Sequence, residues 1–233
     1  RVSAKIGVGM TLDEIRLANT PAAFEPSLDY VVTKLPRFPF DKFVDANNTL
    51  STQMKATGEV MSVGRTFEES LLKGVRSLEI GAFHLHLPKF DGMDTAKLLN
   101  YIRKGTDDRI YAVAELLRRS VDVEEIYGAT GIDRFFIRKV KNITETEMEL
   151  KQHPFDTDEL RSAKKMGFSD KYVARMWKCT ELDVFKFRKE HKLFPVFRMV
   201  DTCHTGAYIP YFYSSYSGEN TSILTDRKKI VVL

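Results

Sequence analysis

The 233-residue chain predicts an α+β fold, in which a small mixed portion precedes an all-helical domain. Two observations support this prediction. Residues 30–35 and 59–63 are short apolar runs bounded by proline or glycine, which is typical of strands. From residue 95 to about residue 193, apolar side chains recur at helical spacing in short stretches separated by brief turns. Such a succession of short amphipathic helices indicates a compact bundle.

The two predicted strands have clear ends. The first covers residues 30–35 and is expected to stop at Pro36, because proline lacks the amide hydrogen that a strand inside a sheet must donate. Pro39 follows and closes this segment. The second strand, residues 59–63, lies between two glycines, whose backbone freedom suits tight turns.

A helix is predicted directly after the second strand. Thr66 is expected to cap it, and Glu69 has the spacing that completes a capping box. Apolar or small residues follow at helical spacing at Phe67, Leu71, Gly74 and Leu78. We therefore assign residues 1–78 to the mixed portion.

The helical domain is predicted to follow a turn-rich, aperiodic stretch at residues 79–93. One of its helices presents an apolar face made of Ile110, Val113, Ala114 and Leu117, and another presents a stripe of Phe136, Val140 and Ile143. Acidic residues stand three positions after Asp122, Asp156 and Thr180, so these three are predicted N-caps. Residues 208–216 are aromatic and strand-like. We assign residues 79–217 to this domain and residues 218–233 to a linker and a final strand.

Composition excludes several classes of protein. At 43% hydrophobic and 29% charged residues, the chain is an ordinary globular sequence. It has no apolar run of the roughly 18 residues that span a bilayer. Two cysteines, Cys179 and Cys203, make no disulfide framework and are expected to be small apolar fillers in a reducing, cytoplasmic setting. The net charge of +4 is too small to indicate nucleic acid by itself.

Charge is unevenly placed along the helical domain. Residues 121–160 hold 5 Lys and Arg against 10 Asp and Glu, whereas residues 161–200 hold 11 against 4. One interpretation is two solvated faces. The other is that the acidic segment meets the basic one, within the domain or across a subunit interface, where complementary charge sets register.

The basic segment also has the appearance of a helix-turn-helix. Three short helices are predicted over residues 156–192, broken at Gly167 and at Cys179, and the last one carries Lys186, Arg188, Lys189 and Lys192. A DNA-binding module is therefore an alternative function, and salt-dependent binding to duplex DNA would favour it. Against it, Leu182, Phe185 and Phe187 on the last helix are expected to be buried on more than one side.

Two histidines, His84 and His86, suggest a second alternative. On a strand their imidazoles would share a face and could bind zinc with a third ligand such as Cys203 or His204. Two histidines without a demonstrated third ligand are a weak signal, and ordinary loop histidines are the other interpretation. We predict no metal site.

The chain shows no catalytic constellation of its own. Residues 7–9 (Gly-Val-Gly) lack the third glycine of a phosphate loop and do not follow a predicted strand. The acidic residues Glu25, Asp29 and Glu59 are expected to act as caps, in turns, or in a salt bridge to Lys34 or Arg37. No catalytic or cofactor-binding residue is assigned in this chain.

Longer motifs resemble one enzyme family. Residues 20–43 read TPAAFEPSLDYVVTKLPRFPFDKF, and residues 55–70 read KATGEVMSVGRTFEES. Both segments resemble the end of the first ATP-grasp half of the carbamoyl phosphate synthase large subunit. Residues 132–136 (IDRFF), 167–171 (GFSDK) and 195–203 (PVFRMVDTC) resemble, in order, the helical oligomerisation domain of that family. Residues 225–233 (TDRKKIVVL) resemble the first strand of its second half.

The sequence departs from the family pattern in two places. Asn19 leads straight to Thr20, where the family has a longer glycine-containing loop, and His204 follows Cys203, where the family continues differently. We expect residues to be missing from the sequence at both places. The chain also starts without an initiating Met and ends on a strand, so we expect it to be a piece of a larger protein.

The resemblance implies a fold, a reaction and partners. The fold would be the C-terminal part of an ATP-grasp domain followed by the oligomerisation domain. The parent would be a cytoplasmic, ATP-dependent carbon–nitrogen ligase that uses ATP with Mg or Mn. It would make carbamoyl phosphate from bicarbonate, ammonia released from glutamine by a small glutaminase subunit, and two ATP, for arginine and pyrimidine synthesis. This segment would be inactive alone and would act as scaffold and as an interface to other large subunits, without nucleic acid or membrane.

The resemblance also implies a path for the intermediate. The family passes carbamate through the protein interior, and carbamate decomposes in water, so the path needs walls that exclude solvent. Leu28 and Met54 lie in the motifs that border the inner end of the first half and could line it. Ordinary core packing is the other interpretation of these two side chains.

Overall fold

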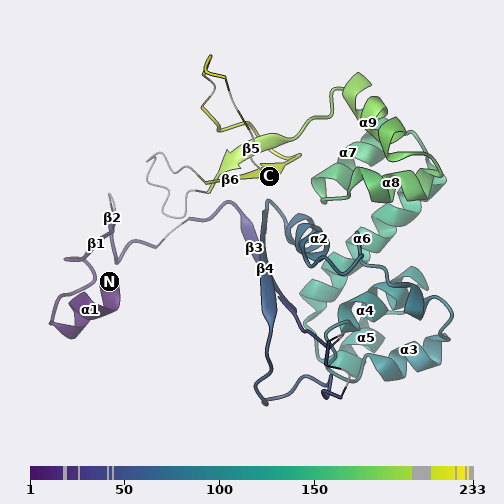
Figure 1. Ribbon diagram of the computed structural model, residues 1–233, viewed down its shortest axis with the longest axis horizontal. Coiled ribbons are helices and arrows are strands. Elements are labelled where there is room, and N and C mark those ends of the chain that lie inside the picture. Colours follow the sequence, from purple (N-terminus) through teal and green to yellow (C-terminus); the bar gives the residue numbers. More distant parts are fainter. Residues whose placement is uncertain are drawn as a thin grey trace.

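The computed structural model describes residues 1–17, 20–25, 27–40, 42–43, 45–200, 211–223, 225–228 and 230. Figure 1 shows a small N-terminal segment, a central hairpin, a group of helices, and a second hairpin above the central one. The helices are α1 (Val2–Gly7), α2 (Phe67–Ser77), α3 (Thr95–Tyr101), α4 (Arg109–Arg118), α5 (Val123–Thr130), α6 (Arg134–Gln152), α7 (Thr157–Lys165), α8 (Asp170–Trp177) and α9 (Glu181–Glu190), with a 3-10 turn at Pro88–Phe90. The strands are β1 (Arg16–Leu17), β2 (Thr20–Pro21), β3 (Val31–Arg37), β4 (Gly58–Gly64), β5 (Val196–Met199) and β6 (Phe212–Ser215). The predicted α+β class is confirmed.

The central hairpin pairs β3 with β4 in antiparallel register, from Val31 opposite Gly64 to Arg37 opposite Gly58. The prediction that the first strand ends at Pro36 is wrong, because β3 continues through Pro36 to Arg37. Within the described residues β3 pairs with β4 alone, so Pro36 lies in an edge strand that tolerates a missing amide hydrogen. The second strand ends on its two glycines, as predicted.

Helix α2 is capped in a way that differs in one detail from the prediction. The Thr66 side chain accepts the amide hydrogen of Glu69 at 3.2 Å, as expected. The Glu69 carboxylate does not complete a capping box with Thr66; it accepts the amide of Arg65 at 2.8 Å and the hydroxyl of Ser215 at 3.1 Å. Glu69 thus links the start of α2 to the distant strand β6.

The main core is built jointly by α2 and the helical bundle. Leu71 and Leu72 of α2 are buried in the same cluster as Leu116 of α4 and Ile143 of α6. Figure 1 shows α2 lying between the central hairpin and α6. The boundary that we place at residues 78 and 79 stays a prediction, because two closely packed domains can also share a core.

The bundle confirms most of the predicted helix features. Asp122, Asp156 and Thr180 cap α5, α7 and α9, and Thr180 forms a complete capping box with Asp183. The apolar faces of α4 and α6 are buried as expected at Val113, Ala114, Leu117, Val140 and Ile143. Phe136 is an exception, with 45% of its surface exposed, since it lies in the first turn of α6 at the margin of the core. Cys179 packs against the core as a free thiol, while Cys203 lies outside the described residues.

The second hairpin, β5 with β6, rests on the first part of the chain. Arg198 of β5 pairs with Asp29 at 2.8 Å, and Lys73 of α2 donates to the carbonyl of Ser214 in β6. The strand predicted at residues 208–216 is confirmed over Phe212–Ser215, and residues 208–210 lie outside the described part. These contacts hold the second hairpin against α2 and against Asp29, which precedes the central hairpin. Within the described residues, no helix is both long and apolar enough to cross a membrane.

Candidate functional site

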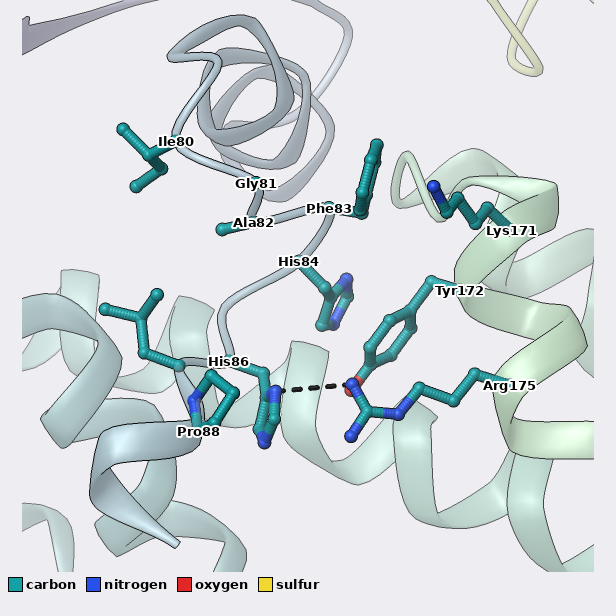
Figure 2. Close-up of a pocket in the computed structure, with 11 residues that line it drawn as sticks. Ile80, Gly81, Ala82, Phe83, His84, His86, Pro88, Lys171, Tyr172 and Arg175 are labelled. Atoms are coloured by element: carbon teal, nitrogen blue, oxygen red, sulfur yellow. Dashed lines mark hydrogen bonds between the residues drawn. The ribbon is translucent and has the colours of Figure 1, made fainter.

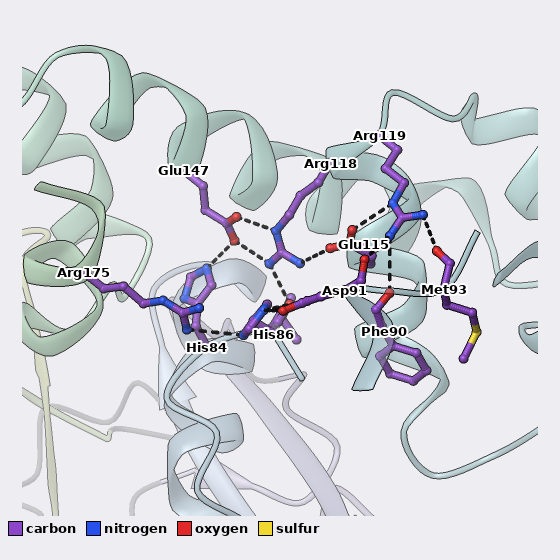
Figure 3. A network of polar contacts seen from close by, with 11 residues as sticks. His84, His86, Phe90, Asp91, Met93, Glu115, Arg118, Arg119, Glu147 and Arg175 are labelled. Carbon is purple, nitrogen blue, oxygen red and sulfur yellow. Dashed lines mark hydrogen bonds and ion pairs between the residues drawn. The ribbon is translucent and has the colours of Figure 1, made fainter. Parts of the chain in front are cut away.

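A buried polar network lies between the loop after α2 and helices α4 and α6 (Figure 3). Its centre is Glu147 of α6, whose carboxylate accepts from Arg118 Nε at 2.6 Å and from Arg118 Nη2 at 2.8 Å. The same carboxylate lies 2.7 Å from Nε2 of His84. The side chains of Glu147 and His84 are only 6% and 1% exposed, so this pairing takes place away from solvent.

The charge states of this network follow from its contacts. Burial opposes charge on Glu147, but the hydrogen bonds and charge of Arg118, together with the contact to His84, outweigh it and lower the pKa of Glu147 to about 2. Burial lowers the pKa of His84, although Glu147 acts in the opposite direction. Glu147 is therefore ionised and His84 neutral, and the hydrogen of the neutral ring lies on Nε2, the nitrogen that is 2.7 Å from the Glu147 carboxylate.

The network also fixes the turn-rich stretch. Arg118 donates to the carbonyl of Leu85 at 2.6 Å, and Arg119 donates to the carbonyls of Met93 at 2.6 Å and Phe90 at 3.3 Å. Glu115 accepts from Arg119 at 2.9 Å and keeps that guanidinium in place. Two arginines at the end of α4 thus satisfy the backbone of a loop that has little regular structure of its own.

The two histidines do not form the zinc face that the alternative required. They lie in a loop and not on a strand, and each has its own carboxylate: His84 has Glu147, while His86 has Asp91 at 2.9 Å. Among the residues that the structure describes, no cluster of three or more His, Cys, Asp and Glu could hold a metal ion. The third ligands considered, Cys203 and His204, lie outside the described residues.

A second buried cluster joins α7, α8 and α9. Asp170 accepts from Lys164 at 2.7 Å and from Arg188 at 2.7 Å, and Arg188 also donates to the carbonyl of Leu193 at 2.9 Å. Burial lowers the pKa of Lys164 to about 8, although Asp170 acts in the opposite direction. One carboxylate thus compensates two cations that are almost withdrawn from water.

Replacing Asp170 by asparagine should remove this compensation and leave two buried cations without a counter-ion. We expect the free energy of unfolding at pH 7 to fall by about 3 kcal/mol. Urea unfolding of Asp170→Asn beside the exposed control Asp158→Asn measures the difference. Equal stability of the two variants would show that the cluster does not hold α7, α8 and α9 together.

The three helices of the helix-turn-helix alternative exist, but their side chains are placed differently from the expectation. Leu182 and Phe185 are 58% and 46% exposed, so the prediction that both are buried is wrong. Arg188 is buried against Asp170 and is not available to a phosphate backbone. The structure adds no observation that favours DNA binding.

Two of the three acidic residues considered in the mixed portion, Asp29 and Glu59, have structural partners. Glu59 pairs with Lys34 at 2.8 Å, as predicted. Asp29 pairs with Arg65 at 2.5 Å and with Arg198 at 2.8 Å, and not with the predicted Lys34 or Arg37. Glu25 is exposed. Asp29 and Glu59, each held by a basic side chain, do not fit as ligands of a magnesium–ATP complex, and we derive no step through that cofactor.

The two candidate tunnel residues lie at the surface of this chain. Leu28 is 53% exposed and Met54 is 96% exposed. Neither side chain is packed in the core of the described residues. The interpretation that they are ordinary core residues of this chain is therefore wrong for both. Their place on a path for carbamate stays a prediction.

Within the chain the acidic and basic segments are joined by the ion pair of Asp158 with Arg161, three residues apart on α7, and not by their buried charges. Glu147 of the acidic segment pairs with Arg118, outside the basic segment, and Arg188 of the basic segment pairs with Asp170 of that same segment. The alternative, in which the two segments meet across a subunit interface, stays a prediction.

The structure also reveals an exposed aromatic patch, which we define as Phe67, Phe135, Phe136, Ile132 and Val32. Phe67 packs at 5.3 Å from Phe136 and 6.4 Å from Phe135, measured between ring centroids. Phe135, Phe136 and Val32 are each about half exposed. Two hollows of about 580 and 320 Å³ adjoin the patch and share Phe67 and Phe136 in their walls. Sequence patterns predicted Phe136 as a core residue and so missed this surface.

A family model described as the oligomerisation domain of the carbamoyl-phosphate synthetase large chain matches residues 59–192. The match covers more than half of the 233 residues and contains all helices from α2 to α9, together with β4 apart from its first residue, Gly58. The resemblance to this domain is thereby confirmed. The ATP-grasp assignment of residues 1–78 and the final strand at residues 218–233 stay predictions.

Proposed function

The chain belongs to the carbamoyl-phosphate synthetase large-chain family through its oligomerisation domain, and we propose that it associates with other large chains through the aromatic patch. The large chain is part of a ligase, and this segment acts in it as scaffold and interface. The segment contributes no catalytic group of its own and is inactive alone.

The aromatic patch is the observation that carries this proposal. Most of its members, Ile132, Phe135, Phe136 and Phe67, lie inside the residues that match the oligomerisation domain. Contiguous exposed apolar side chains on a folded protein mark interaction surfaces. Phenylalanine is enriched at the cores of such interfaces, where it is withdrawn from water on association.

The patch is also well placed on a rigid base. Phe67 begins α2 and Phe135 lies in the first turn of α6, and these two helices share the main core beneath the patch. Glu68 of α2 holds them together by accepting from Asn142 at 3.0 Å and pairing with Lys139 at 3.2 Å. A second copy would therefore meet a surface that needs little rearrangement on binding.

A charge placed in the patch should dissociate the oligomer. We expect Phe135→Glu to raise the dissociation constant of the full-length protein by about a hundredfold, since buried aromatic anchors carry about 2–4 kcal/mol of binding energy. Sedimentation velocity over a dilution series measures this shift. The matched control is Leu182→Glu, which places the same charge at a similarly exposed apolar position on α9.

The two variants separate the possible results. Dissociation by Phe135→Glu and not by Leu182→Glu supports the patch as the interface. An unchanged constant for Phe135→Glu in a folded protein, or an equal effect of Leu182→Glu, would refute it. Circular dichroism of both variants shows whether each is folded.

The reaction of the parent protein completes the proposal. It is the formation of carbamoyl phosphate from bicarbonate, ammonia from glutamine and two ATP with Mg or Mn, in the cytoplasm, with a small glutaminase subunit as partner. This part is supported by the family match and by the motif resemblance of residues 20–43 and 55–70. The products of that reaction supply arginine and pyrimidine synthesis.

A further inference from the structure

A cationic pocket lies between the loop after α2 and helix α8 (Figure 2). Its volume is about 320 Å³, and it is lined by Ile80, Gly81, Ala82, Phe83, His84, His86, Leu87, Pro88, Lys171, Tyr172 and Arg175. Lys171, Tyr172 and Arg175 project from one side of α8 towards the loop that carries the two histidines. The size falls within the range of pockets that bind small molecules.

The charges in this pocket are positive and incompletely compensated. Lys171 lies 3.7 Å from the ring centroid of Phe83, and Arg175 contacts Nδ1 of His86 at 3.4 Å. Neither cation forms an ion pair with a carboxylate among the described residues. The nearby acids are engaged on the other side of the histidines, Asp91 with His86 and Glu147 with His84 and Arg118. Lys171 and Arg175 are four residues apart on α8, where like charges repel each other, so an anion bound beside them would relieve this repulsion.

The inner wall adds a polar atom that lacks a partner. His84 is 1% exposed, and its Nδ1 makes no hydrogen bond within the described residues. Its ring is held flat against Tyr172, with centroids 3.8 Å apart and planes 14° apart. Because Nε2 lies 2.7 Å from the ionised Glu147 carboxylate, the hydrogen of the neutral ring is on Nε2 and Nδ1 is an unprotonated acceptor. A buried acceptor without a hydrogen-bond donor costs free energy, so a ligand that donates a hydrogen bond to this nitrogen would be stabilised in the pocket.

The loop supplies further donors. The amides of Gly81, Ala82 and Phe83 make no hydrogen bond to other described residues. Gly81 has a φ of +77°, which is the left-handed region that glycine adopts readily. Unpaired backbone amides in a loop beside cationic side chains are a common feature of oxyanion sites.

We propose that this pocket binds an oxyanion that carries its own O–H group, of which hydrogen phosphate is the simplest. Lys171 and Arg175 neutralise the anionic oxygens, and the O–H donates to Nδ1 of His84. The apolar walls formed by Ile80, Phe83 and Leu87 leave room for the organic part of a phosphomonoester. This inference rests on the pocket alone and does not depend on the proposed function.

Phosphate and sulfate provide a matched pair of probes. Both are tetrahedral anions of similar size, but near pH 7 only phosphate carries a proton that it can donate. A site that accepts this hydrogen discriminates against sulfate, since the bound sulfate would leave a buried acceptor facing an anionic oxygen. Isothermal titration of the full-length protein at constant ionic strength measures both affinities.

We expect phosphate to bind at least about tenfold more tightly than sulfate. Lys171→Gln and Arg175→Gln should each weaken phosphate binding by about tenfold or more, because each removes a charge-assisted hydrogen bond. Both side chains are at the surface, so the variants should fold. The matched control is Lys186→Gln, which removes an exposed positive charge from α9, outside the pocket.

Each outcome decides the proposal. The proposal is supported if phosphate binding is lost in the two pocket variants and kept in Lys186→Gln, and if sulfate binds the native protein more weakly than phosphate does. If no phosphate binding is detected up to a concentration of about 10 mM, the binding free energy is weaker than roughly 3 kcal/mol and the proposal is overturned. Equal binding of sulfate, or equal loss in Lys186→Gln, would also overturn it, because a nonspecific charge effect would then account for the binding.

Discussion

Replacing Arg118 by methionine is expected to lower the free energy of unfolding at pH 7 by about 3–5 kcal/mol, the usual cost of removing one partner of a buried ion pair. The change leaves Glu147, which is 6% exposed, with His84 as its remaining partner, and His84 is neutral. It also leaves the carbonyl of Leu85 without its donor. Equilibrium unfolding in urea measures the loss.

The loss should depend on pH in a direction set by Glu147. In the native protein the pKa of Glu147 is lowered from 4.5 to about 2, so its ionisation stabilises the fold above pH 4.5 and this stabilisation is lost as pH falls towards 2. In Arg118→Met the main cause of the lowering is gone and burial raises the pKa. The difference in stability between the two proteins should therefore be largest near neutral pH and shrink as pH falls to about 2.

An exposed arginine provides the control. Arg161 pairs with Asp158 at the surface of α7, so Arg161→Met should change the free energy of unfolding by no more than about 0.5 kcal/mol. If Arg118→Met were no less stable than Arg161→Met, the network would not be what holds the loop of residues 80–93 to α4 and α6.

Replacing Gly167 by alanine is the second change with a large expected effect. Gly167 links α7 to α8 with a φ of +91°, where a side chain is strained. An added Cβ would lie 3.1 Å from the backbone Cα and carbonyl oxygen of Glu69, and backbone atoms cannot move aside as a flexible side chain can. We expect a loss of about 2–3 kcal/mol, from strain and from the separation of α2 and the turn after α7.

The same substitution at another glycine isolates this effect. Gly128 lies inside α5, and nothing lies within 4 Å of the position of an added Cβ. Gly128→Ala should therefore stabilise the protein by about 0.5–1 kcal/mol, since alanine favours helix more than glycine. Thermal unfolding of the two variants should give midpoints on opposite sides of that of the native protein. A loss in Gly128→Ala, or none in Gly167→Ala, would contradict the packing described above.

Local signals in the sequence predicted local structure well. The strand between Gly58 and Gly64 and the caps at Asp122, Asp156 and Thr180 depend on neighbouring residues, and the structure confirms them. The prediction that the first strand ends at Pro36 failed because a proline interrupts a strand only when both edges of that strand are paired. The pairing of the edges is decided by the rest of the fold. The predicted burial of Leu182 and Phe185 failed because an apolar residue on a short helix need not face the core.

The buried polar network could not be predicted from the sequence. His84, Arg118 and Glu147 are far apart along the chain, and no spacing rule connects an arginine at the end of one helix with a glutamate in the middle of another. His84 and His86 did attract attention, but their partners come from tertiary packing. The aromatic patch was hidden for a similar reason, since Phe136 has the spacing of the buried stripe and yet lies at the margin of the core.

The central claim is that this chain associates with copies of itself through its oligomerisation domain. Its most direct test is sedimentation equilibrium of the full-length native protein over a wide range of concentration. We predict a reversible association, with a mass that rises from one copy to a multiple of it as concentration increases. A single-copy mass at every concentration up to about 100 μM, which corresponds to a binding free energy weaker than roughly 5.5 kcal/mol, would contradict the claim.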